Sequence, residues 1–384
     1  MNQDEQNKNI ALQKTYIPEE NSKRITSLRF LLIVLVVFIH NNFTVESIAE
    51  NIENGGSEIL FVQNAFGKWV QLFITQGIAR CAVPLFFLFA AYLQGVKNDD
   101  YRTLIKKKTK SLFMPFIIWT AIYGFYFAGL KLIVLKIAPQ FIQNPQSTAL
   151  SWAPIDWIHK IFGYKLKENG ELELPGFAYQ FWFIRDLIIL IVISPVLKFC
   201  IKKFPIGFFI LITILFLGQL QLYFIAEQAL FFYSMGLYWA FFDFQLFKLI
   251  DKITWFESAG LFLFTFIVAH VFYNGKGVFY WFMVLSACII FLKISKIIVI
   301  KEKNFNLVQY LAGFSFFLFA IHTPLLNEWL KRLWLHFFPM KNTFFSLFEY
   351  FGVAFLNICI GTGSGIVMKK IFPKLFYILI GGRK

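Results

Sequence analysis

Long apolar runs, separated by short polar or basic segments, fill the chain from residue 25 onward. An apolar helix of about 20 residues is long enough to cross the hydrocarbon core of a bilayer. The pattern therefore predicts an all-α, polytopic integral membrane protein with about ten transmembrane helices. The predicted spans are residues 25–43, 80–96, 111–137, 181–200, 205–223, 226–242, 255–273, 278–298, 309–329 and 348–371.

The segments around these helices predict a simple domain plan. Residues 1–24 are expected to be a cytoplasmic tail, because they are polar and lack the basic start and short apolar stretch of a signal peptide. Residues 25–372 form one predicted ten-helix membrane domain, and residues 373–384 form a second cytoplasmic tail. An outer loop is expected over residues 138–180, where Trp152, Trp157, Pro154 and Pro175 indicate a segment that folds against the membrane.

The composition excludes several classes of protein. Hydrophobic residues make up 58% of the chain and charged residues only 15%, whereas soluble domains have about 45–50% and about 25%. This rules out an ordinary cytosolic enzyme, a disordered chain and a secreted disulfide scaffold. The four cysteines lie far apart in or beside apolar runs, so we expect small buried hydrophobic side chains and no metal site.

The formal net charge of +15 is explained by membrane topology. With the N-terminus inside, 24 lysines and arginines fall on the inner side of the predicted spans and 10 on the outer side. The positive-inside rule then predicts that both termini are cytoplasmic. No nucleic-acid partner is expected, because the basic residues lie between apolar runs.

The first span carries two ionisable residues, Arg29 and His40, eleven positions apart. Eleven residues of helix make about three turns and rise about 16 Å, so the two side chains share a face but cannot touch. Ionisable residues inside a membrane are candidates for function. A neutral imidazole can act as a general base near neutral pH, although a structural hydrogen bond is an equally good interpretation of His40.

Other candidates stand in later spans. Arg80 begins the second span, Trp182, Arg185 and Asp186 lie in the fourth, and His322 lies in the ninth. Adjacent residues on a helix point about 100° apart, so Arg185 and Asp186 are expected to pair poorly and to find partners on other helices. Arg80, Trp182 and His322 also have simpler interpretations, as an interfacial arginine, an interfacial tryptophan and a packing histidine.

No metal-ligand spacing, phosphate-binding loop, dinucleotide fingerprint or serine-nucleophile motif is visible in the sequence. The candidates are instead a dispersed set of arginine, histidine, tryptophan and aspartate side chains, which only packing can bring together. Such a set suits the binding of an anionic cofactor and the removal of a proton from a hydroxyl group.

These residues resemble the bacterial membrane-bound acyltransferase-3 family over nearly the whole chain. The first span matches that family's pattern of an arginine, ten residues and a histidine, and the second matches its R-x-x-V-P-L-F-F stretch. Four further segments, KKTKSLFMPFIIW, FWFIRDL, FFYSMGLYWA and FAIHTPLL, follow in the same order as in the family. The chain departs from the family at Ala90 and Ala91, where serine and glycine are frequent.

The resemblance implies an integral membrane O-acyltransferase of the bacterial cell membrane. It implies that acetyl-CoA, or another acyl-CoA, is the cytoplasmic co-substrate and that a hydroxyl of an envelope or exported polysaccharide or glycolipid is the acceptor. It further implies His40 as the general base, with Arg185 and Asp186 in the catalytic set. The donor would be bound by Arg29, Arg80, Trp182 and His322.

Two other classes of protein stay open from the sequence. The first is a transporter or exporter of a polysaccharide precursor or small polar solute, which is disfavoured because prolines are spread over the spans without two-fold symmetry. The second is a scaffold or receptor, which would not require intramembrane arginines. The sequence also leaves the acceptor, the acyl group and a homodimeric state undetermined.

Overall fold

A computed structural model of the chain describes residues 17–41, 64–137, 153–163, 176–220, 222, 224–338 and 342–382. The regular secondary structure in these ranges is helical throughout, which confirms the predicted all-α class. The chain divides into two compact units. The first unit comprises Met1–Ile39, Leu72–Lys107 and Ile189–Ser315, and the second comprises His40–Gln71, Lys108–Ile188 and Phe316–Lys384.

Several helices are long and apolar enough to cross a membrane, so the chain is a multi-pass membrane protein. Within the described residues there are five such helices, and six if Glu302–Ala312 and Ser315–Phe337, bent by 48°, form one broken span. The number of ten spans and the cytoplasmic position of the termini stay predictions. The five helices that are long and apolar enough are Ala65–Lys97, Tyr101–Ile133, Trp255–Phe272, Val278–Ile300 and Thr343–Ile371.

Two predicted spans look different in the structure. The fourth is broken into α9 (Trp182–Val192) and α10 (Ser194–Lys203). The break has a local cause, because Pro195 stands at the start of α10 and has no N–H to donate to the preceding turn. The first span, α2 (Glu19–His40), begins six residues earlier than its apolar run and opens with acidic residues, which suit a helix N-terminus.

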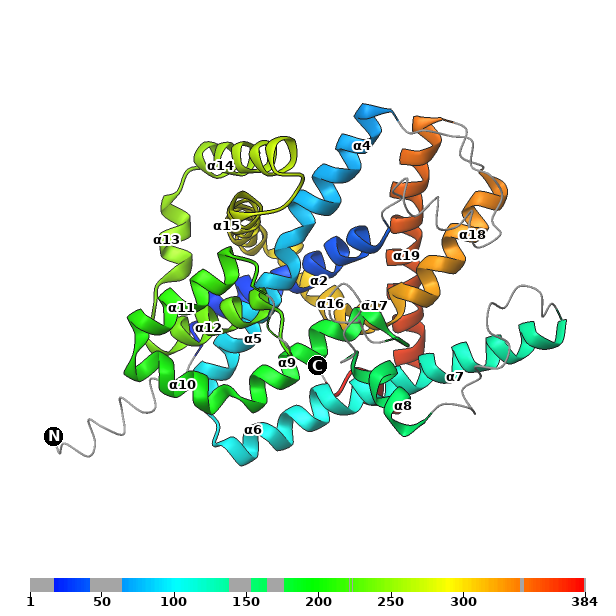
Figure 1. Ribbon diagram of the computed structural model, residues 1–384, viewed down its shortest axis with the longest axis horizontal. Helices are drawn as coiled ribbons and strands as arrows, with labels where there is room; N and C mark the ends of the chain where they lie inside the picture. Colours follow the sequence, from blue (N-terminus) through cyan, green and yellow to red (C-terminus); the bar gives the residue numbers. More distant parts are fainter. Residues whose placement is uncertain are drawn as a thin grey trace. The chain divides into compact units, whose positions relative to one another are not determined.

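The first unit is organised around the pair α5 (Ala82–Lys97) and α12 (Glu227–Phe241), which lie side by side in Figure 1. Small residues allow this close approach. A Cβ atom at Gly236 would lie 2.2 Å from the Leu88 carbonyl oxygen, and one at Gly95 would lie 2.5 Å from the Ala240 Cβ. Small residues at such a crossing let two helix backbones pack closely, as is common in membrane bundles.

Helix α15 is a second centre of packing in the first unit, with contacts to α14, η2 and α13. The hairpin of α14 and α15 is the most extensive of these contacts. The helix that leads into α5 is irregular, with a π-helical turn (η1) followed by a 3-10 turn (η2) that carries Arg80. The bounds are η1 Phe73–Gly77, η2 Ile78–Cys81, α6 Tyr101–Lys108, α11 Pro205–Leu217, α13 Leu246–Lys252, α14 Trp255–Ile267, η7 Val268–Phe272, α15 Val278–Ile300 and α16 Glu302–Ala312.

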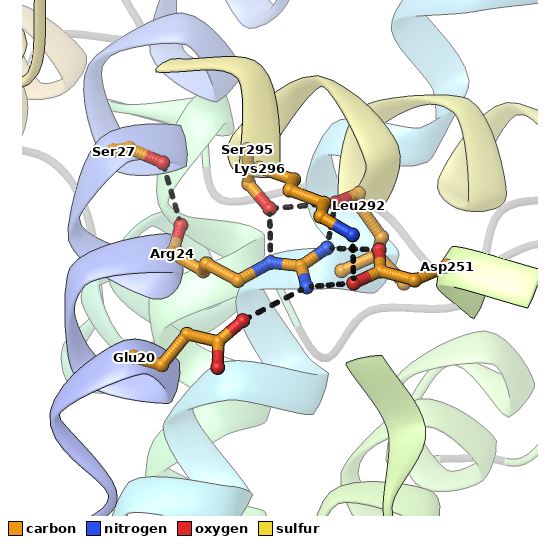
Figure 2. Close-up of polar contacts among 7 residues, drawn as sticks. All are labelled: Glu20, Arg24, Ser27, Asp251, Leu292, Ser295 and Lys296. Atoms are coloured by element: carbon orange, nitrogen blue, oxygen red, sulfur yellow. Dashed lines mark hydrogen bonds and ion pairs between the residues drawn. The ribbon is translucent and has the colours of Figure 1, made fainter. Parts of the chain in front are cut away.

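A buried ion-pair cluster fastens the start of α2 to α13 and α15 (Figure 2). Arg24, which is fully buried, donates to both carboxylate oxygens of Asp251 at 2.9 and 3.0 Å. It also donates to the Ser295 hydroxyl at 2.9 Å and to the Leu292 carbonyl at 2.7 Å. Lys296 contributes a second cation 3.1 Å from Asp251. Burial by itself raises the pKa of Asp251, but hydrogen bonds from Arg24 and Lys296 outweigh it and lower the pKa overall.

The second unit contains the antiparallel neighbours α18 and α19 (Figure 1). Their contact is close at Gly352, where a Cβ atom would lie 2.2 Å from the Trp334 ring. At the other end of the unit, the Trp119 indole donates to the Leu379 carbonyl at 3.0 Å. The bounds are α4 Ala65–Leu72, η3 Thr109–Phe113, α7 Met114–Ile137, α8 Pro154–Phe162, η6 Tyr179–Phe181, α17 Ser315–Ile321, η8 His322–Leu326, α18 Asn327–Phe337, α19 Thr343–Ile371 and α20 Pro373–Leu379.

Candidate active site

Two histidines meet in the second unit. His40 is the last residue of α2, and His322 is the first residue of η8. Their ring centroids lie 5.2 Å apart with the ring planes tilted by 52°. His322 is completely buried. A pair of titratable rings inside a predicted membrane domain is the most evident candidate for proton-transfer chemistry in this unit.

A break in the ninth predicted span brings His322 to this position. Thr323 has extended backbone angles (φ −148°, ψ 154°) inside the helical run, and a cis peptide bond joins it to Pro324. A broken helix leaves carbonyl groups without helical partners, and in a membrane protein these must be satisfied by other groups. Side chains do so here, because the Tyr123 hydroxyl donates to the carbonyls of Ala320 and Thr323.

Two amides complete the support of this break. The Gln180 amide donates to the Ala320 carbonyl at 3.2 Å, and the Asn357 amide donates to the His322 carbonyl at 2.9 Å. The side chains come from separate elements, η6 and α19. The break is therefore a supported feature that gives the histidine a defined place.

The protonation pattern of His322 follows from its contacts. Its Nδ1 lies 2.7 Å from the Phe319 carbonyl oxygen. Since a carbonyl can only accept, Nδ1 carries the proton and donates. In the neutral ring, Nε2 then holds a lone pair, and no hydrogen-bond partner for it is found within the described residues. His322 thus presents an unused acceptor beside His40.

Tyr179 connects the two histidine-bearing segments. Its ring meets the His40 ring edge-on, with centroids 5.4 Å apart, and its hydroxyl shares a 2.5 Å hydrogen bond with the Thr323 hydroxyl. The backbone of His40 is also held, because the Asn327 amide donates to its carbonyl at 2.7 Å. These contacts fix the end of α2 against η6, η8 and α18.

Arg185 and Asp186 pair with each other, so the prediction that they pair poorly is wrong. The Arg185 Nε lies 2.9 Å from the Asp186 Oδ1, and both side chains are buried. An arginine side chain is long enough to fold back to its neighbour, and burial strengthens the attraction between unlike charges. Arg185 also donates to the Phe162 carbonyl of α8 at 2.8 Å. Trp182 begins the same helix.

The other predicted donor-binding residues belong to the first unit. Arg29 is half-buried on α2, eleven residues before His40 on the same helix. Arg80 is half-buried in the 3-10 turn η2, after Gly77 leaves helical backbone geometry (φ −98°, ψ −94°). Its Nε finds no hydrogen-bond partner in the described part of the chain.

Comparison with known proteins identifies the family of this chain. The model of an acyltransferase domain, that of the acyltransferase-3 family, matches residues 23–367. The chain belongs to this family. It is therefore an acyltransferase, as predicted, and its multi-pass helices agree with a membrane enzyme.

A curated relative supports the same conclusion. The chain is 25% identical over 376 residues to the succinoglycan biosynthesis protein ExoH of Rhizobium meliloti (strain 1021), covering 94% of this chain and 92% of that protein. No solved structure matches the chain. The relative's name refers to the synthesis of a polysaccharide.

Several polar residues in the second unit of this acyltransferase were not predicted from its sequence. Asn357 and Glu349 are polar residues inside an apolar run, so the rule that flagged the histidines could have found them as well. Tyr179 and Tyr123 carry no such signal, because tyrosines are ordinary in membrane helices and at their ends. Only the contacts of their hydroxyl groups distinguish them.

Proposed function

We propose that this acyltransferase moves an acyl group, such as acetyl, from cytoplasmic acyl-CoA to a hydroxyl of an envelope or exported polysaccharide or glycolipid. His40 acts as the general base. The pairing of His40 with His322, at 5.2 Å between ring centroids, is the observation that carries this proposal. The polysaccharide in the name of the Rhizobium relative supports the class of acceptor.

The reaction balances without a metal or a covalent enzyme intermediate. His40 takes the proton of the acceptor hydroxyl as its oxygen attacks the thioester carbon. The carbon–sulfur bond then breaks, and the coenzyme A thiolate receives the proton from the imidazolium. Arginine side chains suit the negative charge that develops on the thioester oxygen, and we assign this role to the buried Arg185, which Asp186 holds in place.

The donor would be bound partly through charge and partly through hydrogen bonds. Arg29 and Arg80 suit the phosphate groups of coenzyme A. His322 suits an amide N–H of the pantetheine arm, because its Nε2 is an acceptor without a partner in the described residues. Trp182 offers an aromatic face to the same arm. This arrangement would lie in a bacterial inner membrane with both termini cytoplasmic.

Acetate released by alkali from isolated envelope glycans tests this function. A strain that lacks the gene would carry the wild type, His40→Ala or His336→Ala at matched membrane levels. His336 is an exposed histidine on α18 and serves as the control. We expect acetate with the wild type and with His336→Ala, and a loss of at least about a hundredfold with His40→Ala. Equal acetate in all three strains would refute His40 as the base.

A further inference from the structure

A buried carboxyl group on α19 has no role in the reaction described so far. Glu349 lies in the second turn of α19 and is 0% exposed. Neither of its carboxylate oxygens accepts a hydrogen bond from any described residue. A buried polar group without a partner is costly, and the cost is larger for a carboxylate than for a neutral group. Glu349 therefore requires an explanation beyond packing.

Asn41 provides a second unsatisfied group, in contact with the same turn of α19. Asn41 is also 0% exposed and directly follows His40 in the chain. Its amide donates to the carbonyl of Tyr350, the neighbour of Glu349, at 2.6 Å. Its Oδ1 finds no donor within the described ranges. Three buried oxygen acceptors without a described partner thus belong to the end of α2 and to the turn of α19 that Asn41 contacts.

A cation lies on the helix next to this group. Lys331 lies on the adjacent helix α18, and its positive charge acts on Glu349 and on Glu328. A nearby cation lowers the electrostatic cost of a buried carboxylate. The oxygens of Glu349 still have no hydrogen-bond donor among the described residues. These oxygens therefore suit a ligand that donates hydrogen bonds.

The site lies within reach of the histidine pair. On α19, Glu349 stands eight residues before Asn357, which is about 12 Å of helix. Asn357 lies beside His322, since its amide donates to the His322 carbonyl. Asn41 lies closer still, one residue after His40. A ligand that bridges Asn41 and Glu349 would place a neighbouring group near the His40 ring.

We propose that Glu349 and Asn41 form a subsite for the hydroxyl groups of the acceptor sugar, beside the hydroxyl that is acylated. Sugar hydroxyls donate the hydrogen bonds that these oxygens lack. The subsite favours a sugar with neighbouring hydroxyls. This inference rests on the proposed function, since it takes the acceptor to be a glycan and His40 to be the base.

The test separates acceptor binding from donor binding and from chemistry. The full-length enzyme in lipid nanodiscs would be assayed with acetyl-CoA and with alkali-deacylated envelope polysaccharide from the strain that lacks the gene. For Glu349→Gln we expect KM for the polysaccharide to rise at least about tenfold, as for loss of a charged hydrogen bond, with KM for acetyl-CoA unchanged. Glu349→Asp, which keeps the charge, should show a smaller rise.

Glu328→Gln is the matched control. It removes the same charge near Lys331, but from an exposed position on α18. We expect its KM values to equal those of the wild type. An unchanged KM for the polysaccharide in Glu349→Gln, or a lower kcat with KM unchanged, would overturn the subsite. If Glu349→Gln does not fold, Asn41→Ala decides in its place, and an unchanged KM for the polysaccharide there would likewise overturn it.

Failure of the proposed function would look different. In that case the wild type itself would transfer no acetyl group to the polysaccharide, or His40→Ala would retain full activity. Equilibrium binding of the deacylated polysaccharide to the nanodiscs, with no acetyl-CoA present, still tests the subsite. Binding that is at least about tenfold weaker in Glu349→Gln than in Glu328→Gln would support it, and equal binding would overturn it.

Discussion

The polar groups around Arg24 and those around His40 are both buried, but they differ in how fully they are hydrogen-bonded. Arg24 uses its Nε and both terminal nitrogens, on a carboxylate, a hydroxyl and a carbonyl (Figure 2). In the second unit, by contrast, the Nε2 of His322, both oxygens of Glu349 and the Oδ1 of Asn41 have no partner within the described residues.

This difference separates a structural cluster from a binding site. A satisfied buried network holds helices in one arrangement and has no hydrogen-bonding capacity left for a ligand. Buried groups without partners lower stability unless a ligand supplies the missing bonds. The comparison therefore predicts that changes near Arg24 act mainly on folding, whereas changes near His40 act mainly on catalysis.

The largest expected effect is on stability, from Arg24→Ala. Removal of the Arg24 side chain leaves Asp251 with Lys296 as its cation and takes the donors from the Ser295 hydroxyl and the Leu292 carbonyl, so the free energy of unfolding should fall by about 3 kcal/mol. Thermal unfolding of the purified protein in nanodiscs would measure this. Lys107→Ala is the control, because its ion pair with Asp99 is as short, at 2.8 Å, but Lys107 is exposed. That change should cost at most about 1 kcal/mol. Equal losses in both variants would contradict the comparison.

A smaller effect, on donor binding, is expected from His322→Asn. The asparagine amide can keep the donor to the Phe319 carbonyl, while the Nε2 acceptor is lost. KM for acetyl-CoA should rise about tenfold, and the unfolding temperature should stay close to that of the wild type. Initial rates over a range of acetyl-CoA concentrations give this value. A fall in kcat at constant KM would instead assign His322 to proton transfer.

The smallest effect is expected from Tyr179→Phe. The ring that meets His40 is kept, and only the hydroxyl bond to Thr323 is lost. One neutral hydrogen bond is worth about 1 kcal/mol, so kcat should fall about fivefold. Tyr179→Leu, which also removes the ring, should lower kcat further. If the two variants have the same rate, the ring does not help to position His40.

Much of the architecture follows from the sequence alone. The apolar runs predict a helical membrane protein because a bilayer offers no other partner for backbone polar groups. The eleven-residue spacing on one helix also holds, since Arg29 and His40 both lie on α2. The motifs that resemble the acyltransferase-3 family agree with the family that the comparison shows over residues 23–367.

Contacts between distant segments were decided only by the tertiary structure. The sequence shows His40 and His322 as isolated histidines, and their pairing depends on the break at Thr323. Arg24 appears at the edge of a polar tail in the sequence, yet its buried partner Asp251 stands 227 positions away. A periodic pattern reports which face of a helix is apolar, because that depends on neighbours in the chain. Which polar groups find partners depends on side chains that folding brings together, and those pairings leave no local pattern.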